Sequence, residues 1–207
     1  MISHKLKCIF IHIPRTGGSS IEKCLVGADW WHIDKNTKHL LASQAKKMYS
    51  DYWDDYFKFS FVRNPHSRMI SMYNHRNSRS VYFSDTRLRP GGIISGADID
   101  MYKKKFGDPV LIEYDHRFYE REELETQKHK SNCVYGNILD EPIDYIGKFE
   151  SIETDFNKIR KTLGASKRAL PQLGQSCNHL CLDAEAKLAI NKIYEQDFIN
   201  YNYIPQK

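Results

Sequence analysis

The sequence predicts a three-layer α/β protein with a mainly parallel central sheet. Residues 7–13 and 57–62 have the length and the β-branched or aromatic content of buried strands, and a third strand is expected around residues 144–149. Segments with helical spacing alternate with these runs, which is typical of a parallel sheet with helices on its faces. Because sheets of this kind bind ligands at the carboxyl ends of their strands, function is expected in the segments that follow them.

The first strand leads into a loop with the features of an anion-binding site. The loop and the start of the next helix consist of Pro14, Arg15, Thr16, Gly17, Gly18, Ser19 and Ser20. The proline ends the strand, and the two glycines allow a tight turn and a close approach of the backbone to a ligand. Ser19 or Ser20 is expected to N-cap the helix around residues 21–25, so that amide groups and the positive end of the helix dipole face the loop. Arg15 adds a full positive charge, which favours phosphate or sulfate.

One familiar phosphate-binding motif is absent from this loop, and the interpretation of a turn without a ligand stays open. The loop of nucleoside triphosphatases, G-x-x-x-x-G-K-[ST], needs a lysine directly before the hydroxyl residue, whereas here the cation precedes the glycines. A strand, a glycine turn and a helix also occur in many α/β proteins that bind nothing at that place. The loop alone therefore does not decide whether an anion binds.

The second strand ends in a comparable arrangement. Arg63 follows this strand, Asn64 is a good helix cap, and Pro65 suits the first turn of a helix. Ser71 lies eight residues after Arg63, about two helical turns on, so a folded-back loop would bring both to one oxyanion. We expect Arg63 to bind a ligand, and Arg68 to be a surface charge or a structural ion-pair partner.

Together the two motifs resemble those of the sulfotransferases that use 3′-phosphoadenosine 5′-phosphosulfate (PAPS). In that family the first motif, typically P-K-T-G-G-T-S, holds the 5′-phosphosulfate, and the second, F-V-R-N-P-x-x-R-x-x-S-x-Y, holds the 3′-phosphate. Residues 144–152 and 194–203 are similar to two later segments of the family. The carbohydrate-type branch, with its Golgi and bacterial members, is the most similar. The resemblance implies a P-loop-like sulfotransferase fold in a single domain of residues 1–207.

The resemblance also implies roles for single residues. Arg15 stands where the family usually has lysine, and it keeps the positive charge. Because arginine stays protonated, whether it donates a proton to the leaving group, as lysine could, stays open. His39 lies twenty-four positions before Arg63, about where relatives carry a catalytic histidine or glutamate, so His39 and Arg15 are the expected catalytic residues. The expected donor-binding residues are Arg15, Thr16, Gly17, Gly18, Ser19, Ser20, Arg63 and Ser71, with Lys167 and Arg168 as further contacts to the 3′-phosphate.

Other side chains compete for the role of the base. Glu22 and Asp34 are alternative proton acceptors for the acceptor hydroxyl. His12 lies inside the first strand and is expected to be a packed residue behind the site. His66 and His75 are expected to flank the helix that follows the second strand.

The expected reaction is in-line transfer of the sulfonate from PAPS to an acceptor hydroxyl, with a glycan as the preferred acceptor class. No metal is required, because the cations and the helix N-terminus supply the positive field. Residues 76–142 are expected to recognise the acceptor through Arg76, Arg79, Arg87 and Arg89, with Tyr82 and Phe83 among them, although a solvated charged loop explains these residues equally well. For Cys177 and Cys181, a local disulfide or free thiols are favoured over a metal site.

Composition agrees with this interpretation. The chain has 207 residues, 41% of them apolar, and a net charge of +5, as expected of one ordinary globular domain that binds an anion. No segment approaches the ~18 apolar residues of a membrane span, and the chain enters its first strand within a few residues. We therefore expect a cytoplasmic microbial enzyme, or a trimmed soluble catalytic domain, without a nucleic-acid partner.

Two other functions remain as alternatives. An ATP-dependent nucleoside or small-molecule kinase would share the strand, loop and helix, but it lacks here the lysine–hydroxyl pair and an acidic metal-binding strand end. A non-catalytic nucleotide- or RNA-binding module would fit the basic balance and the thirteen tyrosines. Such a module would lose affinity steeply with salt.

Overall fold

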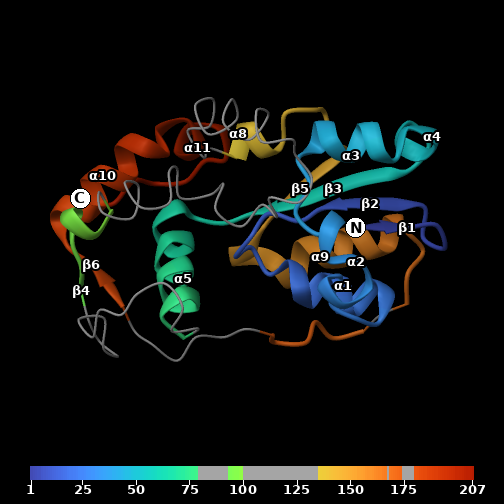
Figure 1. Cartoon of the computed structure of the whole chain (residues 1–207), viewed down its shortest axis with the longest axis horizontal. Coiled ribbons are helices and arrows are strands. Elements are labelled where there is room, and N and C mark those ends of the chain that lie inside the picture. The colour runs from blue at the N-terminus through green and yellow to red at the C-terminus, as the bar shows by residue number, and fades with distance from the viewer. Residues whose placement is uncertain (79–92, 100–134, 167, 174–179) are drawn as a thin grey trace. The chain divides into compact units, whose positions relative to one another are not determined.

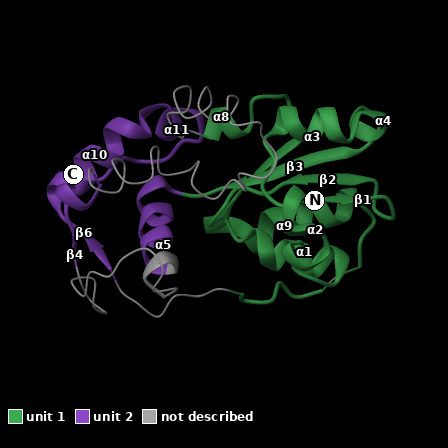
Figure 2. Cartoon of the chain, in the orientation of Figure 1, with its two compact units in different colours: residues 1–63, 113–130, 135–173 green, residues 64–112, 131–134, 174–207 purple. Residues whose placement is uncertain are grey.

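The computed structural model describes residues 1–78, 93–99, 135–166, 168–173 and 180–207. The chain divides into two compact units that alternate along the sequence (Figure 2). Unit 1 contains residues 1–63, 113–130 and 135–173, and unit 2 contains residues 64–112, 131–134 and 174–207. The single domain expected from the sequence stays a prediction.

Unit 1 is built on a four-stranded sheet that is mainly parallel. Its strand order is β1-β2-β3-β5, in which β1 runs antiparallel to β2 and the other neighbours are parallel. The strands are β1 (Ile2–Ser3), β2 (Cys8–Ile11), β3 (Phe57–Val62) and β5 (Tyr145–Lys148). The three runs that the sequence marks as strands therefore form the parallel part of the sheet, and the predicted fold class is confirmed.

The strands form where they do because both faces of the sheet are covered. Every residue of β2 is buried, as are the last four of β3, and a continuous apolar run is the pattern of a strand with two covered faces. Phe10 and Phe59 stack across the two strands with their ring centroids 4.9 Å apart. The Ser60 hydroxyl donates to the carbonyl of Ile11 at 2.7 Å, which fixes the register where both strands end.

Helices lie on both sides of this sheet (Figure 1). α1 and α9 lie on one side, where Ile21, Phe156 and Ile159 join the core of the sheet, and α3 and α4 lie on the other. The spacing of Ile152, Phe156, Ile159 and Leu163 in the sequence predicts a helix over residues 152–163, and α9 confirms it. The helical elements of unit 1 are α1 (Gly18–Val26), α2 (Trp31–Asp34), η1 (Lys35–Thr37), α3 (Ala42–Met48), α4 (Ser50–Trp53), α8 (Tyr135–Ile138), η4 (Phe149–Ser151) and α9 (Ile152–Thr162).

Unit 2 combines helices with a two-stranded parallel ribbon. Its elements are α5 (Pro65–Ser78), β4 (Ile93–Ile94), β6 (Cys181–Leu182), α10 (Ala184–Ile193) and α11 (Glu195–Asn200), and β4 pairs with β6. None of the described helices of either unit has both the length and the apolar character that crossing a membrane requires.

The sequence pattern predicts an amphipathic helix over residues 183–198, capped by Asp183, and the structure differs in its extent. Asp183 caps α10 as expected, because its carboxylate accepts the amide hydrogen of Ala186 at 2.7 Å. The single helix expected over residues 183–198 is instead divided at Tyr194, whose backbone leaves the helical conformation (φ −106°, ψ 21°). The ring of Tyr194 is buried at this bend, so packing of the aromatic side chain accompanies the change of direction.

Several expectations concern residues whose structure is not described. Of the expected acceptor segment, residues 79–92 and 100–134 lie outside the described residues, and so does Cys177. Cys181 is described; it has a free, exposed thiol at the start of β6.

Candidate functional site

The loop after β2 begins α1 earlier than the sequence predicts. Gly17 is the residue that caps the helix, in a left-handed conformation (φ 86°, ψ 8°), and neither Ser19 nor Ser20 forms a side-chain cap. The predicted serine cap is therefore wrong. A left-handed glycine turns the chain into the helix one residue after Thr16, so both serines fall in the first helical turn.

This start leaves backbone donors at the end of α1. The amides of Ser20 and Ile21 donate to the carbonyl of Gly17, at 3.1 and 3.4 Å. Within the described residues, no acceptor pairs with the amides of Gly18 and Ser19, as is usual in the first turn of a helix. Two directed donors at the positive end of a nine-residue helix are suited to binding an anion.

The two glycines of the loop are also needed for packing. A Cβ atom added to Gly18 would lie 2.1 Å from Nε2 of His12, so the imidazole of His12 occupies the space that a side chain would fill. A Cβ on Gly17 would lie 2.6 Å from Cδ1 of Ile152 and 3.2 Å from the ring of Phe149. The loop thus rests directly on β2 and on the segment that starts α9.

Thr16 and Arg15 give the loop its internal order. The Thr16 side chain is fully buried and its hydroxyl donates to the carbonyl of Ile13 at 2.8 Å, so this hydroxyl closes the turn from inside. Arg15 is partly exposed and has a positive φ of 67°, a conformation that few residues other than glycine adopt. Its carbonyl accepts a hydrogen bond from Nη1 of Arg63 at 3.2 Å.

Arg63 is held at the end of β3 by three further contacts. Its guanidinium lies over the ring of Phe149, 4.1 Å from the ring centroid, which is a cation–π contact. Its amide donates to the hydroxyl of Tyr135 at 3.2 Å, and that hydroxyl donates to the carbonyl of Arg63 at 2.5 Å. The cations of the two sequence motifs, Arg15 and Arg63, are therefore joined through the backbone of the first loop.

His39 lies beside this loop, between η1 and α3, and is partly exposed. Its Nδ1 is 2.9 Å from the carbonyl oxygen of His12, and the two imidazoles meet edge to face with their centroids 4.5 Å apart. A carbonyl oxygen only accepts, so Nδ1 of His39 carries the hydrogen. In the neutral ring the lone pair is consequently on Nε2, the form that a general base needs.

Behind the loop lies a buried network of charged side chains. The Glu22 carboxylate receives the Nδ1 hydrogen of His12 (2.6 Å) on one oxygen and pairs with Nζ of Lys38 (3.3 Å) through the other. Lys38 also donates to the hydroxyl oxygen of Ser19 at 3.1 Å and forms a short ion pair with Asp29. Burial alone would raise the pKa of Glu22, but His12 and Lys38 lower it to about 2.

The alternative bases fit less well than His39. Glu22 is fully buried with both oxygens engaged, and a carboxylate with a pKa of about 2 is a weak proton acceptor. The Asp34 carboxylate accepts from the amide of Asn36 at 3.0 Å and from the hydroxyl of Thr37 at 2.8 Å, and it caps η1. His12 is buried, as expected for a residue behind the site.

The remaining predicted donor contacts are not brought together in one described unit. Ser71 and Arg68 are buried on α5 in unit 2, and Arg68, 1% exposed, is not a surface charge. Lys167 lies outside the described residues. Arg168 is exposed in unit 1, and its carbonyl accepts from Nη1 of Arg160 at 2.8 Å. Ser20 uses its hydroxyl within the unit, as the acceptor for the amide of Leu173 at 3.3 Å.

Two residues of the site were missed by sequence reasoning. Lys38 is directly before His39, but a lysine carries no sequence signal that it is buried and paired. Phe149 lies in the segment 144–152, whose resemblance to a family pattern could have marked it. In the described parts of the chain, no group of three or more histidine, cysteine, aspartate or glutamate residues is arranged to hold a metal ion.

Comparison with known proteins gave one match. The family model described as "Sulfotransferase family" matches residues 1–204. Searches of curated proteins and of solved structures each returned no match.

Proposed function

Because the chain belongs to the sulfotransferase family and is a sulfotransferase enzyme, we propose that it moves the sulfonate of PAPS to a carbohydrate hydroxyl. One observation carries the proposal. The amide donors at the start of α1 lie in the same loop as Arg15, whose backbone is bound by Arg63. Donors and cations are thus gathered at the carboxyl ends of two adjacent parallel strands.

In this proposal the first loop binds the phosphosulfate end of the donor. The amides of Gly18 and Ser19 donate to its oxygens, and Arg15 balances the charge that collects on the leaving phosphate. Thr16 and Gly17 shape the loop, and the amide of Ser20 closes the first helical turn by donating to the carbonyl of Gly17. Arg15 acts as a fixed charge and gives up no proton, because arginine stays protonated. These residues supply the positive charge, so the proposal invokes no metal ion.

The 3′-phosphate of the donor is assigned to Arg63, with Ser71 and the basic residues Lys167 and Arg168 as further contacts. This assignment rests on the resemblance of the second motif to the family pattern. The Phe149 ring supports it for Arg63, because a guanidinium stacked on a ring keeps its edge directed and loses less freedom on binding. A second anchor of this kind would distinguish PAPS from ATP, which has no 3′-phosphate.

His39 is assigned the role of the general base. Nε2 of its neutral ring takes the proton of the acceptor hydroxyl while the hydroxyl oxygen forms its bond to sulfur. The bond between sulfur and the bridging oxygen breaks on the opposite side, and adenosine 3′,5′-bisphosphate leaves with that oxygen. A glycan is the proposed acceptor because the motifs resemble the carbohydrate-type branch most.

Calorimetric titration tests the donor. We expect adenosine 3′,5′-bisphosphate to bind at least tenfold more tightly than ATP, which corresponds to about 1.4 kcal/mol. The Arg63→Met variant should lose this preference, and Lys46→Met, at an exposed ion pair with Glu141, is its control. Equal binding of ATP would favour the kinase, and binding of a short RNA in place of the bisphosphate would favour the RNA-binding module.

Turnover with labelled PAPS tests the acceptor and the base. A panel of glycans, phenols and lipid alcohols is screened first, and transfer to a glycan is the expected result. On the best acceptor, His39→Ala should lower kcat by about 10²- to 10⁴-fold, the usual contribution of a positioned base. Full turnover by this variant would remove His39 from the mechanism and leave the family unchanged.

A further inference from the structure

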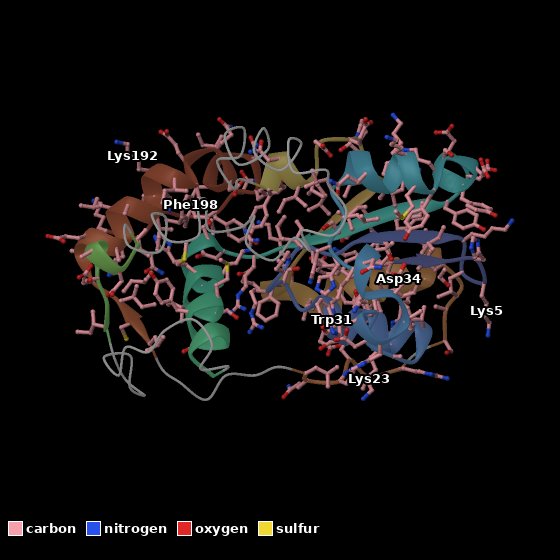
Figure 3. All side chains as sticks on the ribbon, viewed as in Figure 1. Lys5, Lys23, Trp31, Asp34, Lys192 and Phe198 are labelled. Carbon is pink, nitrogen blue, oxygen red and sulfur yellow. The ribbon has the colours of Figure 1, made fainter. Side chains whose placement is uncertain are left out.

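The buried carboxylate of Glu22 is the centre of the network behind the first loop. One oxygen is 2.6 Å from Nδ1 of His12; the other is 3.3 Å from Nζ of Lys38 and accepts the amide hydrogen of Trp30 at 3.0 Å. Its side chain is fully buried, whereas the next residue on α1, Lys23, extends into solvent (Figure 3). A buried charge is costly unless all its hydrogen-bonding positions have partners. Both oxygens of Glu22 have such partners.

Lys38 is the second buried charge, and its ammonium is also fully engaged. An ammonium group has three donors, and Lys38 has three oxygen partners, on Ser19, Glu22 and Asp29. Its side chain is 6% exposed, far from the solvated state that is usual for lysine. Lys38, which directly precedes His39 in the chain, is therefore bound to the first turn of α1 through Ser19.

His39 is consequently supported on two sides by one carboxylate. On one side, its Nδ1 hydrogen bonds to the carbonyl of His12, whose ring is fixed by Glu22. On the other side, its chain neighbour Lys38 is fixed by the second oxygen of Glu22. Two of the supports of the imidazole of His39 thus involve partners of Glu22.

We propose that Glu22 is a positioning residue of the active site: by holding His12 and Lys38 it keeps His39 as the Nδ1–H tautomer and fixes it relative to Ser19. The inference rests on the proposed function only for the role of His39 as the base. Its physical content, the tautomer and its dependence on Glu22, stands on geometry alone.

Glutamate is the one ordinary side chain that satisfies both neighbours. Glutamine has the same shape, but it has one oxygen and one NH2 group, so in either orientation it presents hydrogens to a donor, to Nδ1–H of His12 or to Nζ of Lys38. Aspartate is shorter by one methylene and would not reach both partners. In Glu22→Gln, either His12 or Lys38 therefore loses its acceptor, and one of the two supports of His39 is displaced.

Nitrogen NMR of the histidine rings in the full-length protein tests the proposal without an acceptor. Long-range ¹H–¹⁵N spectra of [¹⁵N]histidine-labelled protein distinguish the two tautomers, and His39→Gln assigns the signals of His39. We expect the Nδ1–H tautomer of neutral His39 in the unchanged protein, and a mixture of both tautomers in Glu22→Gln and in Lys38→Met. The exposed pair of Lys46 and Glu141, 2.8 Å apart in the same unit, supplies matched controls, Glu141→Gln and Lys46→Met, in which His39 should not change.

Two results would overturn the proposal. One is an Nε2–H tautomer of His39 in the unchanged protein, which needs no variant. The other is an unchanged tautomer in Glu22→Gln and Lys38→Met. If a single variant fails to fold, the double variant Glu22→Gln/Lys38→Met answers the question, because it removes both fully buried charges together and leaves only the partly exposed Asp29 without its cation.

Activity gives the second measurement once an acceptor is known. Misplacement of the base should lower kcat by about 10- to 100-fold in Glu22→Gln, while binding of adenosine 3′,5′-bisphosphate stays close to that of the unchanged protein. If the unchanged protein did not bind the bisphosphate, the proposed donor would be contradicted, and the tautomer result would still stand. The two failures are therefore distinguishable.

Discussion

Replacing Gly17 with alanine tests whether the loop is held in place by packing as well as by its turn. Helix α1 offers an internal control, because Gly17 at its start and Gly27 at its end share the same φ of 86°. At Gly27 an added Cβ meets nothing within 4 Å, whereas at Gly17 it lies 2.6 Å from Cδ1 of Ile152 and 3.2 Å from the ring of Phe149. The backbone change is the same at both positions, and only the surroundings differ.

The expected losses follow from these two contributions. A left-handed alanine costs about 1–2 kcal/mol, and this cost applies to both variants. Crowding in a packed interior adds about 1–3 kcal/mol for Gly17→Ala alone. The Ile152 methyl is the flexible end of a side chain and can yield, but the Phe149 ring is covered by the guanidinium of Arg63, so part of the crowding cost remains.

Urea unfolding of both variants measures the difference. We expect the free energy of unfolding of Gly17→Ala to fall below that of Gly27→Ala by about 1–3 kcal/mol. Binding of adenosine 3′,5′-bisphosphate should weaken in Gly17→Ala only, since a displaced Phe149 also displaces Arg63. Equal stability of the two variants, within about 0.5 kcal/mol, would refute the packing argument and leave Gly17 with a conformational role alone.

Three further predictions concern Glu22, the cysteines and Phe149. Because the folded-state pKa of Glu22, about 2, lies below its unfolded value of about 4.3, the stability it contributes is present above that value and is lost as the pH falls from about 5 towards 2; acid unfolding of Glu22→Gln should be flatter across this window. Burial raises the pKa of Cys8 to about 12, so iodoacetamide followed by peptide mapping should label the exposed Cys181 at pH 8 and leave Cys8 unmodified; equal labelling would contradict the burial of Cys8. Phe149→Leu removes the ring under Arg63 and should weaken bisphosphate binding by about 2- to 10-fold in calorimetry, and unchanged affinity would show that the stacking has no part in binding.

The parallel part of the fold could be predicted because its signals are local. The run that became β2 is apolar on both faces and the run that became β3 is rich in aromatic residues, signals that require no knowledge of their partners. β1, at Ile2–Ser3, was not predicted, since two residues carry no periodic pattern and its pairing with β2 is a tertiary event. The bend at Tyr194 was missed for a similar reason: the helical spacing continues across it, and burial of the ring lies outside the sequence pattern.

The site could be predicted in its parts but not in its connections. The motifs placed Arg15 and Arg63 directly after the strands, the family's spacing pointed to His39, and the structure brings Arg15 and Arg63 into contact through a carbonyl oxygen. The serine cap was wrong because preference alone favours serine, whereas a left-handed Gly17 had already started the helix. Lys38 was missed because its partners on Ser19, Glu22 and Asp29 are distant in sequence, and a lysine is expected in solvent.

The hydrogen bond from Arg63 to the backbone of Arg15 has a consequence for folding. It closes a loop of 48 residues and depends on the parallel pairing of β2 with β3, a non-local contact that chains reach slowly. A molecule that binds both arginines is thus a reversible cross-link across that loop and binds only the folded chain. We expect such a ligand to lower the unfolding rate of the sheet and to leave its folding rate nearly the same.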